Sequence, residues 1–160
     1  MRTDIPQTIY LKDYKAPAYQ ADHIDLVFKI YDDYTIVSAK THYKKTRNNQ
    51  EDLILNGEHL VLKSIKLDGV LLQTGKDYQE KHNCLILKCP ALDEFTLEVE
   101  IEINPAANTR LEGLYKSGGN WCTQCEAEGF RTITYFQDRP DVMSTYKVRI
   151  EADKNLCPVL

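Results

Sequence analysis

The chain has 160 residues, of which 42% are hydrophobic and 28% charged, a balance typical of one soluble globular domain. Its net charge of -4 excludes general nucleic-acid binding, because such binding requires a basic surface. No run of about 18 or more apolar residues occurs, so the sequence predicts no membrane span.

Apolar and polar residues alternate with a period of two in the first part of the chain, which is typical of half-buried β-strands. Residues 22–31 and 34–45 are the first two predicted strands, with a turn at residues 32–33 between them. Ile24, Leu26, Phe28 and Ile30 fall on one face of the first strand, and Asp25 and Lys29 fall on the other.

A third predicted strand covers residues 59–67. Its apolar phase slips between Leu62 and Ile65, which indicates a bulge or a bend. Asp68-Gly69 then predicts a two-residue hairpin turn into residues 70–72, because glycine readily takes the positive φ that such turns need.

Four further strands complete the predicted set. Residues 78–80 and 84–87 form a hairpin, residues 94–103 form the most regular strand, and residues 144–152 form the last one. No segment has a convincing period of 3.6. Many short strands separated by turns predict an all-β fold, an antiparallel sheet or sandwich.

The segment Asn104–Asp141 differs in character, because Gly, Asn, Pro and polar residues dominate it. We expect a long irregular segment here, with a β-like run at residues 132–136. Irregular segments of this length are usually functional or disordered. Its aromatic residues argue against disorder.

A polar loop at residues 122–131 is the main candidate site, because loops between rigid elements often carry binding residues. Cys122 and Cys125 form a C-x-x-C, but no second such pair and no fitting α/β context accompany it, so we interpret them as unpaired thiols. The cysteine count of five is odd, which is typical of free thiols in a reducing compartment, and we expect a cytoplasmic protein.

Glu126 and Glu128 are the carboxylates of this loop. We expect one of them to face a pocket while the other makes a structural contact. The residues alone leave open an acid/base pair or a solvated loop. No complete catalytic constellation is present, so we expect no catalytic residue in this chain.

Short motifs spread over most of the chain occur in the order Asp13–Tyr19, Leu55–Glu58, Asn104-Pro105 with Asn108-Thr109, Leu111–Tyr115, Ser117-Gly118, Cys122–Arg131 and Asp138–Val142. Together they resemble the N-terminal domain of the bacterial aminopeptidase N family, zinc metallopeptidases of the gluzincin type. Several motifs in the right order are more specific than any single one.

The resemblance implies that residues 1–160 form one β-rich, saddle-shaped N-terminal domain of a longer enzyme. In that family the zinc-binding H-E-x-x-H lies in the next domain, and it is absent here. We therefore expect no zinc bound by this chain, and the enzyme's own catalytic domain and peptides with a free N-terminus as its partners. The alternative is a stand-alone β-sandwich binding module without peptidase activity.

The resemblance also assigns a substrate site. A family glutamate that binds the substrate's α-amino group matches Glu126, and a pocket-lining glutamine matches Gln124. Trp121 lies where related sequences vary, which is a small departure. With a pKa of about 7.7 to 8.0, an α-amino group is mostly protonated at neutral pH, so a carboxylate can bind it by a charge-assisted hydrogen bond.

Overall fold

The computed structural model describes residues 8, 10–48, 50–155 and 157, so the expected domain limits at residues 1 and 160 lie outside the described part. The described residues form β-strands and two short 3-10 helices without any α-helix, which confirms the all-β prediction. The elements are η1 (Leu11–Asp13), β1 (Tyr19–Ile30), β2 (Thr35–Lys45), β3 (Leu53–Asn56), β4 (Val61–Leu67), β5 (Val70–Leu71), β6 (Tyr78–Lys81), β7 (Cys84–Leu87), β8 (Glu94–Ile103), β9 (Gly113–Ser117), β10 (Asn120–Gln124), η2 (Phe130–Thr132) and β11 (Thr145–Ala152).

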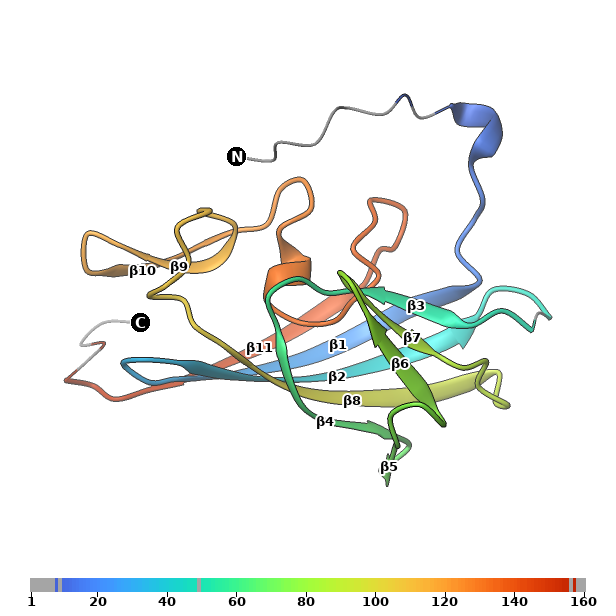
Figure 1. The fold of residues 1–160 in the computed structure, drawn as a ribbon, viewed down its shortest axis with the longest axis horizontal. Coiled ribbons are helices and arrows are strands. Elements are labelled where there is room, and N and C mark those ends of the chain that lie inside the picture. The colour runs from blue at the N-terminus through green and yellow to red at the C-terminus, as the bar shows by residue number, and fades with distance from the viewer. Residues whose placement is uncertain (1–7, 9, 49, 156, 158–160) are drawn as a thin grey trace.

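A curved six-stranded sheet with the order β11-β1-β2-β8-β4-β5 is the largest unit (Figure 1). In this sheet the pairs β1–β2, β2–β8, β8–β4 and β4–β5 are antiparallel, as expected. The predicted irregularity in the third strand is confirmed, because the β4–β8 register shifts between Leu62 and Ser64. The hairpin turn at Asp68-Gly69 is also confirmed, with φ values of 46° and 82°.

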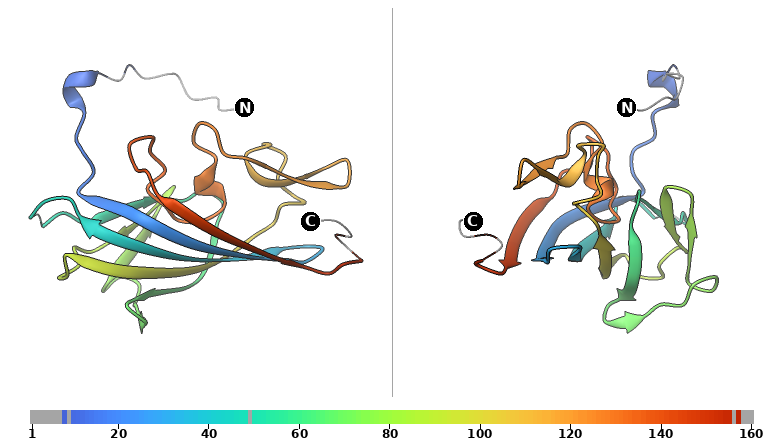
Figure 2. Two further views of the ribbon diagram at one scale, coloured as in Figure 1. Left: turned by 180° about the vertical axis from the view of Figure 1, so that it is seen from behind. Right: turned by 60° about the vertical axis from the view of Figure 1, so that its left-hand side comes forward.

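One pairing differs from the antiparallel prediction, because β11 lies parallel to β1 with Ile24 opposite Tyr146. Two parallel strands cannot be joined by a tight turn and need a long crossover connection. Residues 104–144 supply it after β8. Figure 2 shows this segment, with β9, β10 and η2, passing over one side of the large sheet.

The core lies on the face of the large sheet that the alternation predicts. In β8 the five apolar residues from Phe95 to Ile103 are at most 6% exposed, while the residues between them are more accessible. Burying one such side chain fully contributes about 1.5 to 3 kcal/mol. The side chains of β11 continue the same face but stay about half exposed, at 49% for Tyr146 and 53% for Val148.

The three-stranded sheet β3-β7-β6 contributes to the same core at one end of the large sheet. Leu53 and Leu55 of β3 are fully buried, as is Leu85 of β7. Tyr19 meets Phe95 edge to face in this core, with ring centroids 6.0 Å apart. The short strand β3 had no clear alternation and was not expected from the sequence.

The segment Asn104–Asp141 is less irregular than expected. It contains the β9–β10 hairpin, in which Trp121 pairs with Lys116, so part of the predicted polar loop is a strand. The β-like run at residues 132–136 is wrong as a strand: η2 covers its start, and one isolated bridge joins Phe136 to Asn56. Residues 133–136 are all buried one after another, so the run has no solvent-facing side and forms no ladder.

Candidate functional site

The two residues that the family resemblance selects lie at the end of the β9–β10 hairpin. Gln124 is the last residue of β10 and pairs with Gly113, the first residue of β9. Glu126 follows in a turn, and both side chains are exposed. The backbone N–H of Gly129 donates to the carbonyl of Cys125 at 2.8 Å and closes this turn before η2 begins.

Two glycines make this close folding possible. A Cβ at Gly129 would lie 2.5 Å from the carbonyl oxygen of Gln124 and 2.9 Å from the Cα of Cys125, both backbone atoms. Gly113 has a φ of 69° and would collide with the side chain of Thr132. The sequence therefore places glycine at both points where the turn touches its neighbours.

A hollow of about 360 Å³ opens at this turn, lined by Glu112, Glu126, Ala127, Glu128 and Gly129. We call it the Glu126 hollow. Arg110 donates to Glu112 at 2.7 Å, and Arg131 lies 3.5 Å from Glu128. In the described part of the chain, no residue donates a hydrogen bond to Glu126 or forms an ion pair with it.

A buried ion-pair network lies beneath the hollow. Glu58 is only 7% exposed, and its Oε2 accepts from both terminal nitrogens of Arg110, at 3.1 and 3.2 Å. Arg131 lies 3.9 Å from Glu58 and donates to Asp138 at 2.9 Å. No sequence pattern predicted a role for Arg110 or Arg131. Arg131 is the last residue of the motif Cys122–Arg131, and Arg110 lies between the motifs Asn108-Thr109 and Leu111–Tyr115. These positions next to the family motifs were the one sequence signal that pointed to the two arginines.

A turn at residues 138–141 carries its own ion pair. Arg139 donates to Asp141 at 2.6 and 2.8 Å, and the Tyr14 hydroxyl donates to the same carboxylate at 3.0 Å. The hydrogen bonds from Arg139 and Tyr14 hold the pKa of Asp141 below its usual value. This turn therefore ties the segment after η1 to the start of β11.

Cys122 and Cys125 are not joined by a disulfide in the structure. All five cysteines are free, and Cys122 and Cys125 are only partly buried. Burial raises the pKa of Cys125, and the nearby charge of Asp138 raises it further. Reactive thiols have lowered pKa values, so Cys125 lacks the property that a redox motif requires.

No group of three or more His, Cys, Asp or Glu side chains that could hold a metal ion occurs among the residues that the structure describes. A structural zinc needs four ligands, so this part of the chain does not fit a zinc site. Within the same residues, the helices are too short to cross a membrane.

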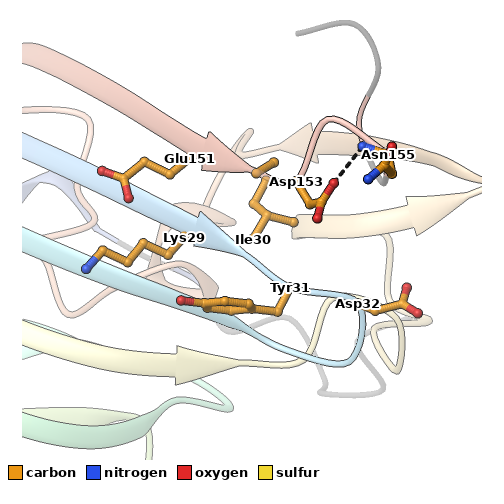
Figure 3. A pocket seen from close by; sticks show the side chains of 8 residues that line it. Lys29, Ile30, Tyr31, Asp32, Glu151, Asp153 and Asn155 are labelled. Carbon is orange, nitrogen blue, oxygen red and sulfur yellow. Dashed lines mark hydrogen bonds between the residues drawn. The ribbon is translucent and has the colours of Figure 1, made fainter.

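A hollow of larger volume, about 660 Å³, lies at the ends of β1 and β11. Figure 3 shows Lys29 and Glu151 on neighbouring strands, with Asp153 accepting a hydrogen bond from the backbone of Asn155 at 2.7 Å. Its wall is open and its charged groups do not converge on one point. We therefore place the candidate site at the Glu126 hollow despite its smaller volume.

Comparison with known protein families decides what kind of domain this is. The profile of the peptidase M1 N-terminal domain family matches residues 19–159. The chain belongs to this family. The family resemblance found in the sequence motifs is thereby confirmed.

Curated relatives agree with the family. The chain is 50% identical over 153 residues to the aminopeptidase N of Caulobacter vibrioides, covering 96% of this chain and 18% of that protein. It is 43% identical over 158 residues to the aminopeptidase N of Escherichia coli, covering 99% of this chain and 18% of that protein. The chain thus spans less than a fifth of the length of these relatives.

Solved structures of other proteins share the fold. The crystal structure of Legionella pneumophila aminopeptidase A in complex with aspartic acid superposes with a TM-score of 0.84 at 31% identity, over 93% of this chain and 18% of that one. Native yeast LTA4 hydrolase superposes with a TM-score of 0.69 at 21% identity, over 84% of this chain and 23% of that one. The second match shows likeness of fold alone.

Proposed function

We propose that this chain is the N-terminal domain of a zinc aminopeptidase and that Glu126 binds the α-ammonium group of the peptide substrate. The observation that carries the proposal is the arrangement of the Glu126 hollow. Glu126 projects from a tightly held turn and has no cationic partner within the described residues, while Glu112 and Glu128 each contact an arginine. A protonated amine supplies the missing charge.

Gln124 lies two residues before Glu126, at the end of β10, and would line the same amine site. A carboxylate at a fixed distance from the zinc admits one residue between them, and this makes the enzyme an exopeptidase. Zinc, bound by a domain outside this chain, would polarise the scissile carbonyl and activate water. This chain contributes recognition and positioning, and the identity to aminopeptidase N over nearly its whole length favours this role over a stand-alone binding module.

We further propose that the enzyme acts in the cytoplasm, where it removes N-terminal residues during peptide catabolism. Five unbridged thiols are consistent with a reducing compartment. The enzyme's own catalytic domain and peptides with a free N-terminus are the proposed partners.

The test is the substitution Glu126→Ala in the full-length enzyme. A charge-assisted hydrogen bond contributes about 1.5 to 3 kcal/mol, so kcat/KM for substrates with a free amine should fall about 10- to 100-fold or more. Glu98→Gln is a matched control, because Glu98 pairs with Lys40 on β2 and does not line the Glu126 hollow. Unchanged kinetics in the Glu126 variant would remove Glu126 from this role.

A further inference from the structure

Three carboxylates line the Glu126 hollow, and they differ in whether an arginine contacts them. Glu112 and Glu128 each contact a guanidinium group, and Glu126 contacts none among the described residues. An arginine in contact with a carboxylate offsets part of its negative charge and occupies the oxygen that it contacts. The two arginines therefore determine which carboxylate the hollow offers to a cation.

Arg110 is the key residue of this arrangement because it contacts two carboxylates at once. One terminal nitrogen donates to Glu112 at 2.7 Å, and both donate to Glu58 at 3.1 and 3.2 Å. Glu58 is nearly inaccessible to solvent and comes from the turn between β3 and β4, 52 residues earlier. A buried charge of this kind needs a paired partner, so Glu58 fixes the guanidinium in place beside the hollow.

Arg131 supports the other side of the hollow. It donates to the carboxylate and to the backbone carbonyl of Asp138, at 2.9 and 3.1 Å, and contacts Glu128 at 3.5 Å. Its backbone carbonyl also accepts from the N–H of Glu58 at 2.9 Å. The two arginines are thus joined through Glu58 into one unit that spans both flanks of the turn.

We propose that Arg110 is a positioning residue of the amine site, held by Glu58, that occupies Glu112 and so leaves Glu126 as the carboxylate offered to a single ammonium group. This inference rests on the proposed function. It adds a specificity rule: the site recognises one cation, because the second carboxylate of the hollow is already paired. Releasing Glu112 should create a site that prefers two cations.

The test compares two competitive inhibitors of similar size in the full-length enzyme, butylamine and 1,3-diaminopropane. In the parent enzyme we expect both to bind with similar Ki values, corrected for the two equivalent amines of the diamine. Arg110→Gln should improve the Ki of the diamine relative to butylamine about tenfold, the factor that one added charge-assisted hydrogen bond contributes. Arg110→Gln combined with Glu112→Gln should return the ratio to the parent value.

Three controls separate this role from general damage to the fold. Arg149→Gln removes an exposed guanidinium that pairs with Glu151 at 2.8 Å on β11, and should leave the ratio unchanged. Glu112→Gln alone keeps the Arg110–Glu58 pair and should also leave the ratio unchanged, so it tests the proposal even where Arg110→Gln does not fold. Arg110→Lys, which retains the charge, should give a smaller change than Arg110→Gln.

An unchanged ratio in folded Arg110→Gln would overturn the proposal, as would a changed ratio that persists in the double variant or arises in Glu112→Gln alone. These results are distinct from failure of the proposed function. If Glu126→Ala leaves kcat/KM unchanged, amine binding by Glu126 itself is wrong. If Glu126→Ala impairs the enzyme but the inhibitor ratios never change, only the role of Arg110 is wrong.

Discussion

Replacing Gly129 by alanine tests whether the turn that carries Glu126 is as closely packed as its geometry indicates. The new methyl group would lie 2.5 Å from the carbonyl oxygen of Gln124, whereas ordinary contacts begin at 3.4 Å. The two groups must therefore separate by about 0.9 Å, the difference of these distances. Neither can rotate away, because Gln124 is held in the β9–β10 ladder and Gly129 is bonded to Cys125.

The expected cost follows from overpacking, which typically destabilises a protein by about 1 to 3 kcal/mol. With a urea m-value of about 2 kcal/mol per molar, this corresponds to a midpoint lower by about 0.5 to 1.5 M. We expect the displacement to reach Gln124 and Glu126, so their amide NMR shifts should change as well. In the full-length enzyme the same variant should raise KM for free-amine substrates.

Gly118→Ala is the matched control in the same hairpin. Gly118 has a φ of 57° but no atom within 4 Å of a Cβ, so alanine there costs backbone strain without pushing on the Glu126 turn. Its amide shift changes should stay near the β9–β10 turn. A Gly129→Ala midpoint within about 0.2 M of the parent, with unchanged shifts at Gln124 and Glu126, would refute the close packing of the turn.

Two further predictions concern pH and metal. The pKa of Asp141 lies below its unfolded value of about 3.9, so its stabilisation is fully present above about pH 4 and is lost as pH falls through the folded pKa. Asp141→Asn should therefore lower the free energy of unfolding by no more than about 1 kcal/mol at pH 7, since the pair is partly exposed. Urea titrations should show this difference shrink steadily as pH falls below the unfolded pKa of about 3.9; a difference that stays constant over that fall in pH contradicts the assignment. The purified chain should contain no stoichiometric zinc and cleave no peptide, and metal analysis that finds one zinc per chain would overturn this expectation.

Local pattern was sufficient for several strands of the fold. Alternation located β1, β2 and β8, because each has one face against the core and one face toward solvent. Successive residues of such a strand therefore alternate between apolar and polar types. The same reasoning located the irregularity near Leu62 and the turn at Asp68-Gly69. It failed at residues 132–136, where Ile133 to Phe136 are all buried and only the isolated bridge from Phe136 to Asn56 forms in the described residues.

The site was predictable only through the family motif. Residues alone left Glu126 and Glu128 as two equivalent carboxylates in a polar loop. The contacts that distinguish them, from Arg131 to Glu128 and from Arg110 to Glu112, appear only in the folded chain. Glu58 lies 52 residues from Arg110, and no local periodicity reports a pair at that separation.

The sequence by itself determined that this protein is an all-β domain of the peptidase M1 N-terminal family, because strand alternation and short motifs are properties of nearby residues. The tertiary structure decided the parallel pairing of β11 with β1, the ion-pair network under the Glu126 hollow and the carboxylate that remains unpartnered in the described residues. The physical reason is that strand pairing and ion pairs depend on which distant segments come into contact. A crossover of about 40 residues separates these segments in the sequence, so no local pattern reports their contact.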